Sequence, residues 1–247
     1  MNDTLHPARM GLEPLPLADW LAPQPGDRAL LAERARLMAA YGGDVVAALP
    51  EADAAVAELA DVLRDRGFPI LPAPDSFIAL GAIGQAVAED ICVLTPAPDH
   101  TFRLTAGLLC FPNRWKLREK LGGSVLAVHG PVPDYAAQLT ANVDRFLARL
   151  KPERAYIRSN WGLAGAPDLF LPEPTPPVDP QGDAAMYLRR EDQSFLKLPR
   201  TGTVIFAIRT HVQAWSETPE RHRADILKSI RGLSPDWLAY KSIRREM

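Results

Sequence analysis

The stretch that decides the fold is FRLTAGLLCFPNRWKLREKLGGSVLAVHGPVP, residues 102–133. Its first ten residues, Phe102 to Phe111, are almost all non-polar, which predicts a strand that is covered on both faces. The Pro-Asn pair that follows ends this strand. Trp115 to Leu121 then has the composition of one or two helical turns, closed by the glycines at 122 and 123.

The same stretch ends on His129. Val125 to Val128 predicts a second short strand, and the Gly-Pro-Val-Pro sequence after the histidine restricts the backbone. A histidine held on so rigid a corner can serve as a metal ligand or a base, or it can only satisfy its hydrogen bonds in a core. Cys110 and His129 could form a thiol–base pair, but both neighbourhoods are apolar and nothing in them lowers the pKa of a thiol.

Outside this stretch, hydrophobic spacing predicts a series of helices and strands. Helices are expected over residues 27–40, 51–66, 78–87, 135–150 and 218–231, strands over 91–94, 155–163 and 203–211, and residues 186–198 fit either. Because helices and strands are grouped rather than strictly alternating, an α+β fold is favoured over a doubly wound sheet. The simplest architecture is one domain over residues 1–247, with a helical N-terminal arm over residues 1–77.

Composition excludes several classes of partner. The 247 residues carry a net charge of −2, which gives no reason to expect nucleic acid or an anionic membrane. No apolar run approaches the length of a membrane span. The two cysteines, Cys92 and Cys110, lie in apolar segments and suit a reducing compartment, so we expect a cytoplasmic protein.

The common catalytic motifs are missing from the sequence. There is no GxGxxG after a strand, no P-loop and no GxSxG elbow. The five histidines lack the close spacing of a multi-histidine metal site. The residues alone therefore indicate an α+β domain with one or two well-placed histidines and several arginines on strands.

Several segments, in order along the chain, resemble the α-subunit family of haem-dependent oxidative N-demethylases. They are MGLEPL (10–15) with Trp20, AVAEDICVL (86–94), LCFPNRW (109–115) with KLG (120–122), VHGPVPDY (128–135), RSNW (158–161), LRREDQSFLKLP (188–199), and VIFAIRTH (204–211) with YK (240–241). No single segment is diagnostic, but together they span some 230 residues. Two positions depart from the family pattern: Asp192 stands where an arginine is expected, and His211 where an aromatic residue, often Tyr, is commoner.

This resemblance implies a PAS-like haem-binding fold, an antiparallel sheet with flanking helices. It also implies haem b, held non-covalently because the chain has no CxxCH motif. The implied reaction is the oxidation of a small methylated amine by O2, with release of formaldehyde. Since the chain carries no flavin, nicotinamide or iron–sulfur motif, electrons would come from a flavin/iron–sulfur reductase.

The resemblance also suggests roles for individual residues. His129 is the expected axial ligand of the iron, with His211 as the rival. Trp161, Arg158 and Arg189 are expected to contact the cofactor, the arginines through its propionates or in the distal pocket. Arg209, His211 and Glu191 are the expected catalytic residues, and Gln193 belongs to the same segment as Glu191.

Two other functions remain open at this stage. A haem sensor or carrier would use the same fold without catalysis. A structural or interaction subunit would have lost the cofactor altogether. Fold and pocket alone do not separate these possibilities from an enzyme.

Overall fold

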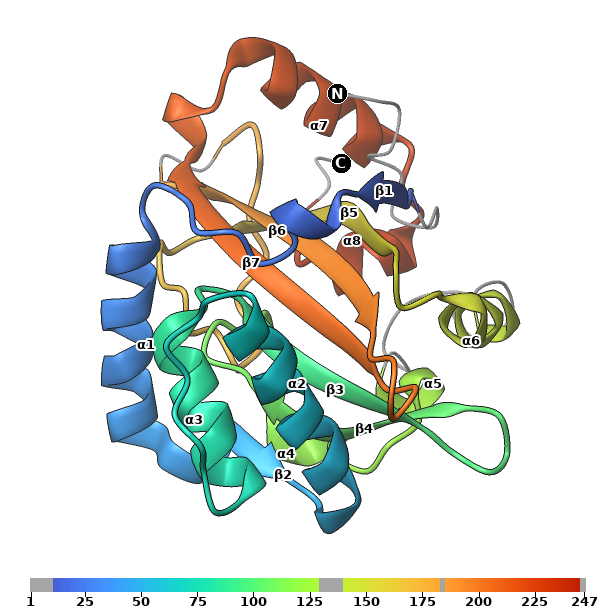
Figure 1. Ribbon diagram of the computed structural model, residues 1–247. Coiled ribbons are helices and arrows are strands. Elements are labelled where there is room, and N and C mark those ends of the chain that lie inside the picture. Colours follow the sequence, from blue (N-terminus) through green and yellow to red (C-terminus); the bar gives the residue numbers. More distant parts are fainter. Residues whose placement is uncertain (1–10, 129–139, 183–184, 245–247) are drawn as a thin grey trace.

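A computed structural model describes residues 11–128, 140–182 and 185–244. Within these residues one seven-stranded sheet runs in the order β1-β5-β6-β7-β3-β4-β2, and each neighbouring pair is antiparallel. The predicted α+β class is therefore confirmed (Figure 1). The strands are β1 (Glu13–Leu15), β2 (Val46–Ala48), β3 (Asp90–Pro96), β4 (Phe102–Leu108), β5 (Ala155–Ala164), β6 (Tyr187–Lys197) and β7 (Val204–Ala214).

Three long strands, β5, β6 and β7, form the centre of the sheet. β6 covers the segment for which the sequence allowed either a strand or a helix. It pairs with β5 on one side and with β7 on the other over almost its whole length. Because both edges of β6 are hydrogen-bonded, its charged residues are held extended in spite of their weak strand pattern.

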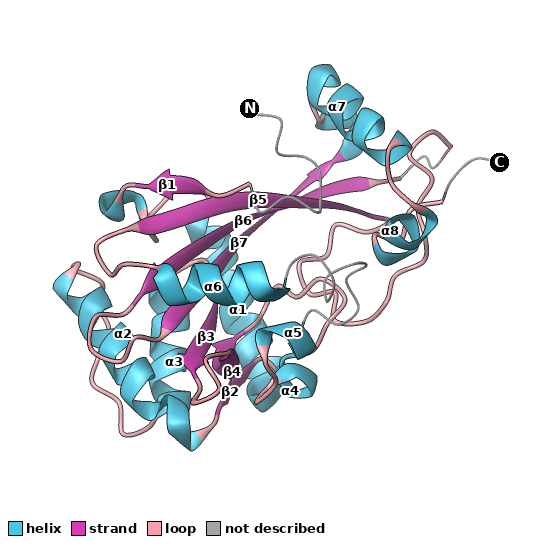
Figure 2. Cartoon of the chain, turned by 90° about the vertical axis from the view of Figure 1, so that its right-hand side faces the viewer, coloured by secondary structure: helices cyan, strands magenta, loops and turns pink. Residues whose placement is uncertain are grey.

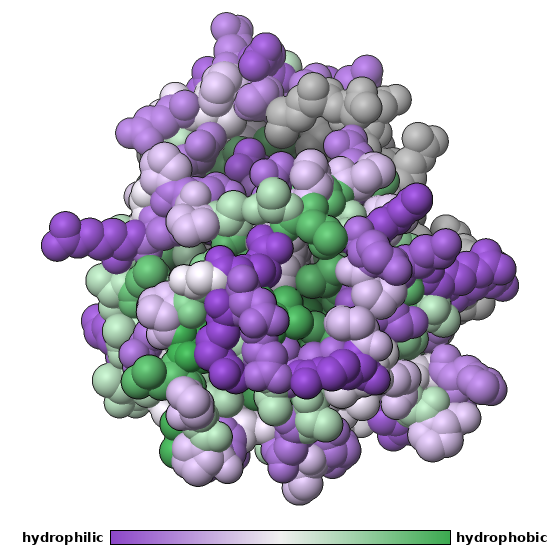
Figure 3. Space-filling view, viewed as in Figure 1, coloured by the Kyte–Doolittle hydropathy of each residue, from purple (hydrophilic) through white to green (hydrophobic). Residues whose placement is uncertain are grey.

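Three helices cover one face of the sheet: α1 (Asp27–Tyr41), α2 (Asp53–Asp65) and α3 (Ser76–Ala86). Leu59 and Leu63 of α2 and Ile83 of α3 are fully buried in the core that also holds the inward side chains of β3 and β7. In the space-filling view of this face, hydrophilic residues dominate the outline, and hydrophobic ones show mainly in the middle and at the lower left (Figure 3). None of the helices in the described part of the chain is long and apolar enough to cross a membrane.

The opposite face of the sheet carries a second set of helices. They are α4 (Leu117–Lys120), α5 (Val125–Val128) and α6 (Thr140–Arg149), and a view from this side shows α6 in front of the sheet (Figure 2). At the far end of the long strands, α7 (Glu220–Arg231) and α8 (Pro235–Tyr240) pack in a further apolar cluster that includes Trp161 and Trp237.

The stretch at residues 102–133 contributes β4 and α4, as predicted. β4 is buried on both faces except at Arg103. Gly107 lets α4 approach closely, because a Cβ on Gly107 would lie 2.8 Å from Cδ1 of Leu117. The glycine that closes α4, Gly122, has φ +80°, a conformation that other residues rarely adopt.

The strand predicted over Val125–Val128 is wrong, because these residues form the helical turn α5. The hydroxyl of Ser124 accepts a hydrogen bond from the backbone N–H of Ala127 at 3.2 Å, which stabilises the start of a helix. Apolar runs this short carry no period that separates a strand from a helix.

Residues 11–77, expected to form a helical arm, also supply both edge strands of the sheet. β1 pairs with β5, and β2 pairs with β4 at the other edge. α1 is tied to the central strands by Asp27, whose carboxylate pairs with Arg209 of β7 at 2.5 Å. This segment is therefore part of the sheet and of its main core.

Candidate functional site

A cavity of about 530 Å³ lies between the sheet and the α4–α6 layer. This volume falls in the range of small-molecule and cofactor sites, roughly 300–1,000 Å³. Most of its wall is apolar, with side chains from the sheet on one side and from α5 and α6 on the other. These apolar residues include Cys92, Leu94, Leu104, Val125, Val128, Val143, Phe146, Leu147, Phe195, Phe206 and Ile208.

Polar side chains also line the cavity. They come from the centre of the sheet, from the loop after β4, from α4 and from the segment that begins in α8. They are Asn113, Arg114, Glu119, Lys120, Arg158, Asn160, Glu191, Gln193, Tyr240, Lys241 and Ser242. Arg114, Arg158, Glu191, Tyr240 and Lys241 also influence one another electrostatically. We call the part of the cavity formed by these five residues the polar end.

Strand alternation places the sheet residues of the polar end. Arg158 on β5 faces Gln193 on β6, and Asn160 faces Glu191, in the antiparallel register. Side chains two residues apart on one strand point to the same face, so all four line the cavity. Nε2 of Gln193 donates a hydrogen bond to Oε2 of Glu191 at 3.0 Å, which fixes a carboxylate that is only 8% exposed.

Lys241 is a buried lysine, 3% exposed, in the same wall. Its Nζ donates a hydrogen bond to the carbonyl oxygen of Trp161 at 2.6 Å and lies 4.3 Å from the centre of the Trp161 ring. Burial, together with the positive charges of Arg114 and Arg158, lowers the pKa of Lys241 to about 7. Near neutral pH this side chain can therefore both give and take a proton.

Arg114 and Ser242 have unusual backbone conformations and contact each other. Their φ angles are +63° and +52°, in the left-handed region that residues other than glycine seldom adopt. Nη1 of Arg114 donates to the hydroxyl oxygen of Ser242 at 2.6 Å. Arg114 is also held through its backbone N–H to the carbonyl of Leu171, and the carbonyl of Ser242 accepts from Val178. Such conformations persist where surrounding contacts hold them, often at functional sites.

The structure brings together only some of the residues predicted from the sequence. Arg158, Trp161, Glu191 and Gln193 line the cavity. His129 lies outside the described residues. Val128, which immediately precedes it in the sequence, lines the cavity.

Arg189 does not line the cavity. Its guanidinium is 2% exposed and donates to the backbone carbonyls of Leu169 at 3.1 Å, Phe111 at 2.5 Å and Pro112 at 3.2 Å. These bonds tie the loop after β4 to the segment after β5, and both segments contact the cavity wall. Nε of Arg189 also lies 3.6 Å from Oε1 of Glu191, so Arg189 holds these two segments together and places a positive charge beside a carboxylate of the cavity.

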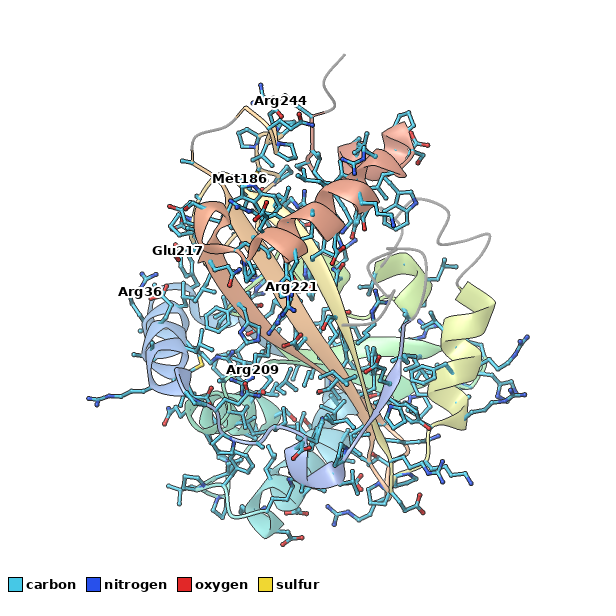
Figure 4. All side chains as sticks on the ribbon, turned by 90° about the horizontal axis from the view of Figure 1, so that it is seen from above. Arg36, Met186, Arg209, Glu217, Arg221 and Arg244 are labelled. Atoms are coloured by element: carbon cyan, nitrogen blue, oxygen red, sulfur yellow. The ribbon has the colours of Figure 1, made fainter. Side chains whose placement is uncertain are left out.

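Arg209 and His211 point to the opposite face of the sheet. On β7, Phe206 and Ile208 line the cavity, so the odd-numbered residues 209 and 211 face the other way. Arg209 pairs with Asp27 and with Glu89 at 2.7 Å, on the side of β7 that faces α1 (Figure 4). The structure does not place either residue at the cavity.

Asp192 and His211, the two residues that depart from the family pattern, contact each other on that opposite face. Nε2 of His211 lies 3.0 Å from Oδ2 of Asp192, and the carboxylate also accepts from the hydroxyl of Ser159 and from Arg190. Burial acts to raise the pKa of Asp192, but these hydrogen bonds and charges outweigh it and lower the pKa. Asp192 and His211 therefore belong to a local hydrogen-bonded network away from the cavity, in which Arg190 and Asp192 form an ion pair.

Sequence reasoning missed Arg114, Tyr240, Lys241 and Ser242. The signal was present, because LCFPNRW and YK are among the segments that carry the family resemblance. Arg114 lies in an irregular loop, and Lys241 follows the last helix, so hydrophobic spacing gives no reason to place them together. Only the tertiary structure joins these distant segments around one cavity.

Neither cysteine supports thiol chemistry. Both are buried and free. Burial, reinforced by the negative charge of Asp90, raises the pKa of Cys110 to about 12 and that of Cys92 further still. The thiolate would therefore be scarce at neutral pH. Across the residues that the structure describes, no group of three or more His, Cys, Asp or Glu side chains could hold a metal ion.

The fold and the cavity define an α+β protein that encloses a largely apolar cavity with charged side chains at one end. Comparison with known families then makes the class specific. Residues 63–246 match the family described as "Haem-dependent oxidative N-demethylase, alpha subunit-like", and the chain belongs to this family. A comparison with curated proteins finds no match.

Proposed function

We propose that this protein binds one haem b non-covalently and uses it to oxidise the N-methyl group of a small methylated amine. The observation that carries the proposal is the cavity, which is apolar between the sheet and α5–α6 and charged at its polar end. Haem has the same division, because its macrocycle is apolar and its propionates are anionic. Membership of a family described as haem-dependent supports the same cofactor.

His129 remains our proposed axial ligand. Haem needs one imidazole from the protein, so an isolated histidine is sufficient. Val125 and Val128 of α5 line the apolar part of the cavity, and His129 is the next residue in the sequence. The apolar side chains around the cavity would keep water from the macrocycle.

Glu191 and Gln193 are proposed to position the amine. When bound, haem supplies the activation of O2. The carboxylate of Glu191 can accept an N–H of the ammonium group, and Gln193 keeps that carboxylate in place. Arg158 faces Gln193 across the strands and adds a cation to the same wall. Holding the methyl group in one orientation is the main contribution that these side chains can make.

The reaction requires electrons from outside the chain. One oxygen atom of O2 leaves in formaldehyde and the other in water, so each turnover takes up two electrons and two protons. Because the sequence lacks flavin, nicotinamide and iron–sulfur motifs, we propose a flavin/iron–sulfur reductase as the donor. The family description, which names an alpha subunit, supports work with a partner.

A haem titration of the purified chain tests the cofactor and its ligand together. We expect a Soret band that saturates at one haem per chain, and we expect His129→Ala to weaken haem binding or change the spectrum. His211→Ala is the matched control, since His211 lies on the opposite face of the sheet and should leave the spectrum unchanged. Absence of a Soret band in the unaltered protein would sink the proposal.

A second assay tests the reaction itself. The haem-loaded chain with NADPH, O2 and a small methylated amine, either dimethylamine or N-methylglycine, should release negligible formaldehyde, whereas addition of a flavin/iron–sulfur reductase should start turnover with at least one of the two amines. Haem binding without formaldehyde release under every electron supply would instead favour a haem carrier or sensor. Sustained turnover with NADPH alone would contradict the proposed need for a partner.

A further inference from the structure

The polar end of the cavity has an excess of positive charge. Among the described residues that form it, Arg114, Arg158 and Lys241 are cationic groups, and Glu191 supplies the only carboxylate. A simple methylammonium ion would meet net repulsion there. Two of the cations, Arg114 and Lys241, come from segments to which the sequence assigned no role.

Arg114 and Lys241 have Glu191 as the one nearby carboxylate that acts on both of their charges. Among the residues that the structure describes, Arg114 donates to the hydroxyl of Ser242, and Lys241 donates to a backbone carbonyl. Neither makes an ion pair with a carboxylate in that part of the chain. Arg114, Arg158 and Lys241 together outnumber this one carboxylate, so the wall is suited to an anionic ligand that would offset the excess positive charge.

The backbone gives a second, independent indication. Of the four described residues other than glycine with positive φ, two are Arg114 and Ser242, and they hydrogen-bond to each other in this wall. Bonds from three separate segments hold them in that conformation. Residues held in such conformations by surrounding contacts cluster at binding and catalytic sites.

We propose that Arg114, Lys241 and Arg158 form a carboxylate-binding site at the polar end of the cavity. The inference rests on the proposed function, because that function supplies two sources of a carboxylate. One is a propionate of haem. The other is the substrate, which would then be an N-methyl amino acid whose ammonium group reaches Glu191 while its carboxylate reaches the cations.

Paired probes distinguish the two sources. Haem carries charged propionates, which are neutral methyl esters in haem dimethyl ester, and N-methylglycine carries a carboxylate that dimethylamine lacks. Haem binding is followed by the Soret band. Binding of the amines to the haem-free and the haem-loaded protein is followed by tryptophan fluorescence, because Trp161 and Trp237 line the cavity.

The variants are Arg114→Gln and Lys241→Met, with Arg118→Gln as the matched control. Arg118 lies four residues after Arg114 but is exposed and pairs with Asp44. If propionates occupy the site, each variant should weaken haem about ten- to a hundredfold and leave the ester unchanged, since a charge-assisted hydrogen bond contributes about 1.5–3 kcal/mol. If the substrate supplies the carboxylate, each variant should instead weaken the binding of N-methylglycine by the same factor and leave the binding of dimethylamine unchanged.

Either pattern supports the site and names its ligand. The inference is overturned if both variants bind all four probes as the unaltered protein does, or if Arg118→Gln shows the same losses. Failure of the proposed function gives a different result. In that case neither haem nor its ester binds, and the binding of N-methylglycine to the haem-free protein and its variants still tests the carboxylate site. Two variants are used because one of them could unfold, which circular dichroism would reveal.

Discussion

Lys241 should make the stability of the protein depend on pH. Its pKa in the folded state is about 7, whereas that of an unfolded chain is near the ordinary lysine value, about 10.4. Between these two values the unfolded state binds more protons, so the free energy of unfolding rises with pH by at most about 1.4 kcal/mol for each unit. Below pH 7 both states are protonated and the full cost of burying the charge remains.

The test is Lys241→Met, compared with the unaltered protein by urea unfolding at several pH values from 6.5 to 9.5. The variant lacks this titration, so its stability relative to the unaltered protein should be greatest at pH 6.5 and decline as the pH rises. Lys228→Met on the exposed side of α7 is the control and should show no such trend. A difference that is independent of pH would mean that Lys241 keeps an ordinary pKa.

The sequence could predict candidate site residues on strands but not the face to which each points. Glu191 and Arg209 looked equivalent, since both are charged residues within mixed strands. The register of β6 and β7 sends Glu191 into the cavity and Arg209 towards α1. A shift of one residue in the register of strand pairing moves each side chain to the other face of the sheet, and a single sequence does not determine that register.

Among the elements, the loop after β4 depends on a buried ion pair. Asp90 at the start of β3 accepts hydrogen bonds from the backbone N–H groups of Cys110 and Phe111 at 2.9 and 2.7 Å and from Arg34 of α1 at 3.0 Å. Both side chains of the Arg34–Asp90 pair are fully buried. The pair therefore fixes the loop that carries Arg114 into the cavity.

Removal of one partner should be far more costly than removal of an exposed ion pair. We expect Asp90→Ala to lower the free energy of unfolding by about 3–5 kcal/mol, because the charge of Arg34 and two backbone donors lose their partner. Asp61→Ala, on the exposed face of α2, should have a much smaller effect. In a double-mutant cycle, Arg34→Met should lower the free energy of unfolding by less in the Asp90→Ala variant than in the unaltered protein. If the effects of the two substitutions simply add, the two side chains are not coupled.

The contact between α4 and β4 should be intolerant of added volume. A methyl group on Gly107 would lie 2.8 Å from Cδ1 of Leu117 and 3.2 Å from the carbonyl oxygen of Ile91, which cannot easily move. Gly107→Ala should therefore destabilise the protein by about 1–3 kcal/mol, measured by urea unfolding. Gly81→Ala in α3 is the control, because nothing lies within 4 Å of its added methyl group; it should be neutral or stabilising.

Most elements could be predicted because their hydrophobic periods are long enough to be distinct. The helices α1, α2 and α3 and the strands β4, β5 and β7 lie close to the predicted segments. The failure at α5 and the ambiguity at β6 share a cause: a four-residue apolar run has no measurable period, and a charged strand is recognised only through its partners. The three-residue strands β1 and β2 left no signal of their own.

At the scale of the whole molecule, the cavity should link cofactor binding to stability. Its walls come from the sheet, from α5 and α6 and from the segment that begins in α8, so a ligand in the cavity contacts parts of the chain that are far apart in sequence. A ligand that binds only the folded state stabilises it by about 4 kcal/mol at a thousandfold excess over its Kd. Saturating haem should therefore raise Tm, and His129→Ala should abolish that shift; an unchanged Tm at full Soret occupancy would contradict the proposed site.

The placement of β1 and β2 has a consequence for how the chain folds. Both strands come from the first part of the sequence, yet they close opposite edges of the sheet, Glu13 against Ile157 and Val46 against Leu108. The pairs β3–β4 and β6–β7 join neighbouring segments and can form early, whereas the edges must wait for distant segments to meet. Until then the outer edges of β4 and β5 expose unpaired backbone N–H and C=O groups, which can pair with a strand of another chain. Refolding should accordingly be slow and lose yield as the protein concentration rises, and pulsed hydrogen exchange should show β6 and β7 protected before β1 and β2.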